Sequence, residues 1–248
     1  MSSTETRYSA RFQMPDLLEQ GRDNATQCPA YLDGALAEPS SGTVTVFNAA
    51  GTEVVSAAAV VVSGSIATYT VLAAALAAEN LEEGWVVEWA LVMPDLVTHT
   101  FRNSAACVRR RLYPSITDLD LFRRESSLNP AGNDPVTTLA DYQDFIDEAD
   151  VDVQQRLIQK GNRPNLITDP STLRPVWLYL TLSLVFEDMA TRQNETWAAK
   201  AAHYRDMYER EFSRLSVLYD GDDDGMPDSA TNRRSLAGSV WLCGRSSR

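Results

Sequence analysis

The sequence has little of what catalytic and disulfide-stabilised proteins commonly need. It contains two histidines and three cysteines among 248 residues. This scarcity disfavours a histidine-rich metal site, a histidine-dependent catalytic triad and a disulfide scaffold. The cysteines, Cys28, Cys107 and Cys243, are odd in number and far apart, so we expect free thiols. We therefore expect a structural or binding protein and not an enzyme.

Long apolar runs are also missing. The longest lies near Val176 to Phe186, where Thr181 and Ser183 interrupt it, and it is much shorter than the ~20 residues of a membrane-spanning helix. The first twenty residues lack the apolar core of a signal peptide. We therefore expect no membrane partner, and assembly in a reducing cytoplasm.

The chain has no surplus of basic residues. It has 22 Lys and Arg against 34 Asp and Glu, a net charge of −12, which argues against a protein that binds nucleic acid by broad phosphate neutralisation. Residues 229–248 differ, with four arginines and no acidic residue. Residues 1–228 contain the other 18 basic residues and all 34 acidic ones, so this part of the chain has a net charge of −16. The chain thus combines an acidic body with a basic tail.

The hydrophobic period changes near Pro114. Before it, β-branched runs between turn signals, among them a run from Glu53 to Val62, predict a small antiparallel β-sandwich or barrel. After it, apolar residues recur at three- and four-residue steps and predict a helical bundle. The predicted fold class is therefore α+β. The predicted divisions are 1–35 as an N-terminal extended arm, 36–112 as the β domain, 113–219 as the helical domain, and 220–248 as an acidic loop and extended basic tail.

Two aromatic residues and two histidines need separate interpretation. Trp85 and Trp89 share a face of one predicted strand because strand side chains alternate. They fit a sugar-binding platform or the core, and the core is favoured. His99 and His203 lie beside no nucleophile signature, so we expect structural roles for both.

The sharpest motif follows the last predicted helix. Alternate aspartates with Gly225 at the turn resemble a calcium-type loop, because hard cations take several carboxylate oxygens. Thr231 stands where the complete EF-hand loop has a bidentate Glu. Two interpretations stay open: a Ca²⁺ site that orders the hinge before the tail, or a solvated acidic loop without a cofactor. The candidate ligands are Asp220, Asp222, Asp224 and Asp228.

The helical half, taken as a unit, resembles the head–tail connector (adaptor) proteins of tailed bacteriophages. The resemblance covers residues 112–228. The segments that carry it are Tyr113-Pro-Ser-Ile-Thr-Asp118-Leu, the predicted helix Ala140–Ala149, Leu157-Ile158 to Gly161, the apolar helix Leu173–Ala190, Ala202-His-Tyr204 through Tyr208 to Leu215, and the loop Tyr219–Gly225.

The resemblance implies a virion structural protein of the neck, assembled in the host cytoplasm. Such adaptors are helical bundles that form a dodecameric ring beneath the portal protein, and their C-terminal tails contact the portal. The ring also contacts the next neck or tail protein, and DNA passes through its channel without sequence-specific binding. The expected portal-contact residues of the tail are Arg233, Arg234, Leu236, Trp241 and Arg245, because aromatic and arginine side chains are frequent interface anchors.

Other functions are compatible with parts of the sequence. Another neck or tail-completion protein of the virion would share the helical half. A Ca²⁺-dependent binding module with a ligand surface on the β domain would use the aspartate loop. A hydrolase acting through His99 or His203 is the third alternative.

Overall fold

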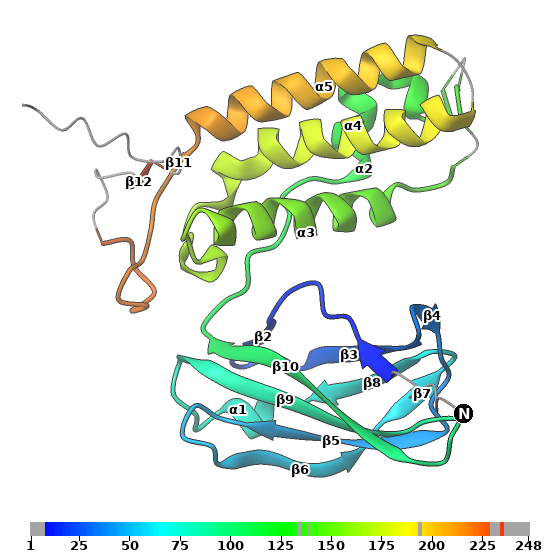
Figure 1. The fold of residues 1–248 in the computed structure, drawn as a ribbon. Coiled ribbons are helices and arrows are strands. Elements are labelled where there is room, and N and C mark those ends of the chain that lie inside the picture. The colour runs from blue at the N-terminus through cyan, green and yellow to red at the C-terminus, as the bar shows by residue number, and fades with distance from the viewer. Residues whose placement is uncertain (1–7, 133–134, 138, 193–194, 229–233, 236–248) are drawn as a thin grey trace, which may run out of the picture. The chain divides into compact units, whose positions relative to one another are not determined.

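The chain folds into two compact units, Met1–Arg111 and Leu112–Arg248, and each is described by itself. The first unit holds two β-sheets and the second holds most of the helices (Figure 1), so the α+β fold class is confirmed. The division lies one residue from the predicted end of the β domain. The structure is a computed structural model, and it describes residues 8–132, 135–137, 139–192, 195–228 and 234–235.

Two sheets enclose the core of the first unit. One sheet has the order β1 (Tyr8–Ala10), β3 (Asn24–Leu32), β8 (Ile66–Val71) and β7 (Val61–Ser63), with β4 (Ala35–Leu36) paired to β3. The other has the order β2 (Asp16–Glu19), β10 (Thr98–Val108), β9 (Glu82–Val92), β5 (Ser41–Phe47) and β6 (Glu53–Ala59). A short helix, α1 (Ala73–Leu76), connects β8 to β9. Buried residues of both sheets form one hydrophobic cluster between them.

One strand pair departs from the predicted antiparallel pattern. β2 runs parallel to β10, with Asp16 opposite Ala105 and Glu19 opposite Val108. Parallel neighbours need a long connection between them, and the strands β3 to β9 supply it. The prediction of a purely antiparallel domain is therefore wrong at this pair.

The prediction that residues 1–35 form an extended N-terminal arm is also wrong for those of them that the structure describes. These residues form β1, β2, β3 and the start of β4, and β3 pairs with both β1 and β8. Asn24 is buried at the start of β3, where its side chain accepts a hydrogen bond from the Glu19 N–H (2.8 Å) and donates to the Glu19 carbonyl (3.0 Å). A polar side chain is stable in the core when it is satisfied in this way.

The second unit is built around one central helix. The helix α4 (Arg174–Arg192) contacts α2 (Asp118–Arg124), α3 (Gln143–Gln159) and α5 (Glu195–Arg214). Most of its apolar residues, among them Trp177 and Phe186, are buried, as its nearly continuous apolar sequence predicts. Three 3₁₀ turns, Ser126–Leu128, Pro164–Leu166 and Pro170–Leu173, and two short strands, β11 (Ser216–Val217) and β12 (Arg234–Ser235), complete the unit. None of the helices in the described ranges is long and apolar enough to cross a membrane.

A column of stacked aromatic rings joins α4 to α5. Phe186 stacks on Trp197 and on Tyr204, with ring centroids 5.6 and 5.7 Å apart, and Tyr204 stacks on Tyr179 at 6.2 Å. The Tyr204 hydroxyl donates to Glu125 (2.5 Å), which immediately follows α2. Burial and this carboxylate raise the pKa of Tyr204. The column therefore ties three helices together and keeps the phenol protonated.

Candidate functional site

The chain beyond α5 makes a loop and returns. After α5 ends at Arg214, β11 pairs antiparallel with β12, with Ser216 opposite Ser235 and Val217 opposite Arg234 (Figure 1). The acidic loop thus lies between two paired segments. Arg234 and Ser235 of the basic tail therefore lie beside the residues that follow α5.

The base of the acidic loop is attached to the segment that precedes α4. Ile167 forms a β-bridge with Tyr219, and the Asp220 N–H donates to the Leu166 carbonyl (2.9 Å). The Thr168 N–H donates to the Leu218 carbonyl (3.1 Å). These backbone bonds hold the first aspartate of the loop against the helical unit.

Asp220 organises the loop from inside. Its side chain is 3% exposed, and its carboxylate accepts the N–H groups of Asp224 (3.1 Å) and Gly225 (2.8 Å). The tight turn from Asp220 to Gly225 has left-handed backbone at Asp223 (φ 54°) and at Gly225 (φ 93°). Glycine is favoured in this backbone conformation. The sequence prediction of Gly225 at the turn agrees with this geometry.

Three of the four candidate ligands come together. Asp220, Asp222 and Asp224 each place one carboxylate oxygen within 4.8 Å of the others. The negative charge of Asp224 raises the pKa of Asp222. A bound divalent cation would remove this repulsion, and carboxylate oxygens are the ligands that hard cations prefer. The group could therefore hold a metal ion.

The fourth candidate, Asp228, closes the loop instead. Its Oδ1 accepts the Gly221 N–H (2.7 Å), and its own N–H donates to the Tyr219 carbonyl (3.0 Å). A Cβ at position 221 would lie 2.9 Å from Asp228 Oδ2, so the closure depends on glycine there. Thr231, the predicted twelfth position, lies outside the described residues.

The predicted tail residues are only partly described. Arg234 lies in β12, and its backbone pairs with Val217, a pairing that the sequence analysis did not predict. The other candidate contacts, Arg233, Leu236, Trp241 and Arg245, fall outside the part of the chain that the structure describes.

The tryptophans, histidines and cysteines considered from the sequence lie in the core or pack against neighbouring side chains. Trp85 and Trp89 are fully buried in the first unit, which confirms the core interpretation and rules out a sugar platform on their faces. His99 contacts Asp95 (3.0 Å), and the His203 ring packs edge-on against Tyr204. Neither Cys28 nor Cys107 is joined in a disulfide within the described residues, as expected, and both are buried; Cys243 lies outside those residues.

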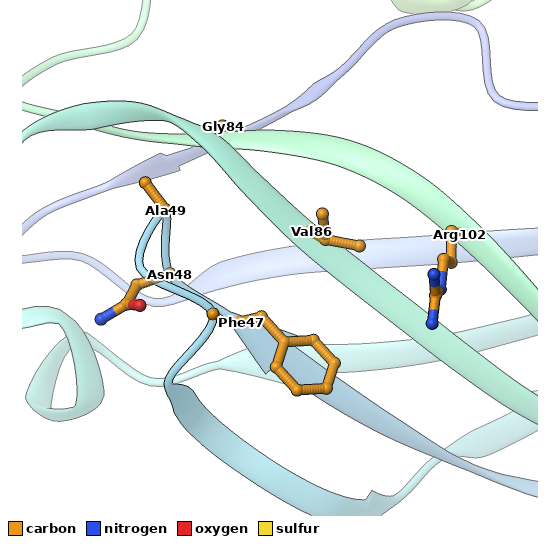
Figure 2. A pocket seen from close by; sticks show the side chains of 7 residues that line it. Phe47, Asn48, Ala49, Gly84, Val86 and Arg102 are labelled. Atoms are coloured by element: carbon orange, nitrogen blue, oxygen red, sulfur yellow. The ribbon is translucent and has the colours of Figure 1, made fainter.

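The first unit also carries an open hollow of about 320 Å³ that the sequence analysis missed. It lies on the outward face of the larger sheet, where Val86 is opposite Phe47 (Figure 2). Arg102 lies at its edge, with its Nε donating to Glu88 (2.6 Å). Only strand register brings these residues together. The lining residues are Phe47, Asn48, Ala49, Gly51, Gly84, Val86 and Arg102.

No model of a known protein family matches this chain, and no curated protein matches it either.

Proposed function

We propose that this chain is a structural protein of the virion neck in a tailed bacteriophage. In this proposal it is the head–tail connector (adaptor), which docks beneath the portal ring through its C-terminal tail and continues the DNA channel toward the phage tail. Its helical unit acts as the bundle of that family, and it catalyses no reaction. The β11–β12 pairing is the observation that carries the proposal, because it attaches the tail 229–248, of net charge +4, to an acidic body at Arg234 and Ser235.

The proposed partners follow from this arrangement. They are the portal protein, neighbouring copies in a dodecameric ring, the next neck or tail protein, and DNA in transit. Exposed acidic residues along and just before α3 support the last of these, because like charge lets a duplex slide without binding. These residues are Asp141, Asp144, Asp147, Glu148 and Asp152.

Truncation tests the portal contact. A chain that ends at Asp228 lacks the whole basic tail, and a chain that ends at Ser235 keeps β12. We expect both to retain the far-ultraviolet circular dichroism of the helical unit. We expect neither to sediment with portal-bearing heads, because both lack the proposed anchors Leu236, Trp241 and Arg245.

A charge-matched pair separates portal contact from general electrostatics. Replacing Arg233 and Arg234 by Gln removes two positive charges from the tail, and replacing Arg210 and Arg214 by Gln removes two from the exposed surface of α5. Only the tail variant should lose head binding, by about tenfold or more. Normal head binding by either truncated chain would contradict the proposed function.

We also propose Ca²⁺ as the ion of the aspartate loop. Replacing Asp222 and Asp224 by Asn removes two of the three converging carboxylates, so Ca²⁺ binding in calorimetry should weaken by about tenfold or more. Because Thr231 stands in place of a bidentate acid, the expected dissociation constant of the unaltered chain is about 10⁻⁴–10⁻³ M.

Asp223 supplies the control for this titration. It lies in the same loop but outside the converging group, so Asp223→Asn removes a neighbouring charge and leaves the three ligands in place. An equal loss of affinity in this variant, or no binding by the unaltered chain at about 10 mM Ca²⁺, would favour the solvated loop without a cofactor.

A further inference from the structure

The outward strand positions on one sheet face of the first unit hold no charged residue, and the Arg11 guanidinium, just after β1, lies 5.0 Å from the centre of the Tyr31 ring on this face. Along β3, buried positions alternate with outward ones. Residues paired with the outward positions of β3 on neighbouring strands point to the same side, so the strand register identifies the outward residues of the whole sheet. The outward positions of β1, β3, β8 and β7, with Leu36 of β4, include no Asp, Glu, Lys or Arg. Charged residues make up 23% of the chain, so this neutral face differs from the composition of the whole.

Apolar side chains project from the neutral face. Val61 is 69% exposed, Leu36 is 67% exposed and Ile66 is 37% exposed. Register places Ile66 opposite Pro29, and it places Leu36 opposite Tyr31. Exposed apolar side chains gathered on one face of a folded chain commonly mark an interaction surface.

The central strands of the other sheet are nearly as poor in outward net charge, while the exposed Glu53 of β6 stands opposite Phe47 beside them. Over Thr43–Phe47 of β5, Val86–Val92 of β9 and Thr98–Ser104 of β10, its outward charged residues are Glu88 and Arg102, which form an ion pair. The apolar hollow beside Phe47 lies on this face (Figure 2). We call it the hollow face.

These two faces lie on opposite sides of the unit, because the hydrophobic cluster lies between the sheets. Two copies with a net charge of −12 repel each other over most of their surfaces. Contact between the neutral face and the hollow face brings few charges together, and the charges beside them, Arg11 and Glu53, are of opposite sign. Apolar side chains project from one face, and the other face has a hollow with a mainly apolar lining that could receive them.

We propose that the neutral face of one copy docks on the hollow face of the next copy. Such a contact joins two different surfaces, and it produces a ring when the rotation between copies closes. This contact names the surfaces that would join neighbouring copies in the ring of the proposed function. That the copies form a ring rests on that function. The contact itself rests on the two faces.

Two substitutions at exposed positions test the two faces independently. Val61→Glu places a charge on the neutral face, and Arg102→Glu leaves two acids side by side on the hollow face. Gln159→Glu, at an exposed position at the end of α3, adds one negative charge elsewhere. Sedimentation velocity of the full chain from about 10 to about 500 µM should show oligomers larger than dimers for the unaltered and the Gln159→Glu chains.

Each face variant alone should be monomeric over that range, because each loses one half of the contact. An equimolar mixture of the two should form dimers and stop there, since Val61→Glu keeps an intact hollow face and Arg102→Glu keeps an intact neutral face. Thr68→Glu, on the neutral face beside Val61, should behave as Val61→Glu does. Circular dichroism verifies that each variant is folded.

Two results would overturn the proposal. One is an unaltered chain that stays monomeric at the highest concentration. The other is dimerisation of Arg102→Glu alone, which would mean that neutral faces pair with each other. Failure of the proposed function is distinguishable, because a chain that oligomerises through these faces but does not bind portal-bearing heads would contradict that function alone.

Discussion

Replacing Phe186 by alanine is expected to lower the free energy of unfolding of the helical unit by about 3–5 kcal/mol. The ring is fully buried in α4 and stacks between Trp197 and Tyr204 of α5. The Lys200 ammonium also lies 4.9 Å from the centre of the ring. The truncation removes apolar burial and leaves a cavity at the contact between two helices, and offset stacking contributes about 0.5–1.5 kcal/mol beyond burial.

Two controls separate stacking from volume. Phe186→Leu keeps most of the apolar volume and should cost about 1–1.5 kcal/mol. Leu119→Ala truncates a side chain of α2 that is 62% exposed, and it should change stability by less than about 0.5 kcal/mol. The measurement is chemical denaturation followed at the helical circular dichroism band. A loss below about 1 kcal/mol for Phe186→Ala would show that the column does not hold α4 against α5.

Replacing Asp16 by asparagine is expected to stabilise the first unit at neutral pH. Burial raises the pKa of Asp16 from its ordinary 3.8 to about 6, although the Asn103 amide (3.0 Å) and the Arg111 charge oppose the shift. The folded chain therefore binds this proton more tightly than the unfolded chain does. Its stability falls as pH rises from about 4 through about 6, and the full cost above that is up to about 3 kcal/mol.

The asparagine variant carries no such cost. It should exceed the unaltered chain in stability by up to about 3 kcal/mol near pH 8 and match it near pH 4. Glu38→Gln removes a charge from an exposed position of the same unit and should give a difference that does not follow this pH profile. Urea denaturation at several pH values, followed by tryptophan fluorescence, measures both. A constant difference from pH 4 to pH 8 would contradict the assignment to Asp16.

The period of apolar residues predicted the parts of the fold in which burial and hydropathy agree. The change at Pro114 lies close to the division between the units at Arg111, and α4 is the buried helix that its apolar sequence predicts. β3 was missed because its buried positions include Asn24, Thr26 and Cys28. Their burial depends on hydrogen bonds and neighbours that exist only after the chain has folded.

The run from Glu53 to Val62 shows a second limit. It was predicted as one strand, but the structure divides it into β6 and β7, which belong to different sheets. The Val60 N–H between them donates to the Gly42 carbonyl (3.2 Å). Hydropathy is similar on both sides of Val60, so the pattern holds no sign that the chain changes sheets there.

The aspartate loop was predictable only in part. Alternate carboxylates predicted the convergence of Asp220, Asp222 and Asp224, and these three do converge. The closing contact of Asp228 depends on the close approach of Gly221, which spacing along the chain does not show. The hollow beside Phe47 has the same origin, since it depends on the register of β5 against β9.

The return of β12 to β11 also has a mechanical consequence. A pull on the chain beyond Ser235 first loads the two residue pairs of this ladder and reaches α5 through them. If the ladder and the backbone bonds of Leu218, Tyr219 and Asp220 both open, the segment 218–233 can extend by at most about 55 Å before tension reaches the helix directly. The acidic loop would then act as a length reserve, which lets a bound C-terminus move while the helical unit stays folded.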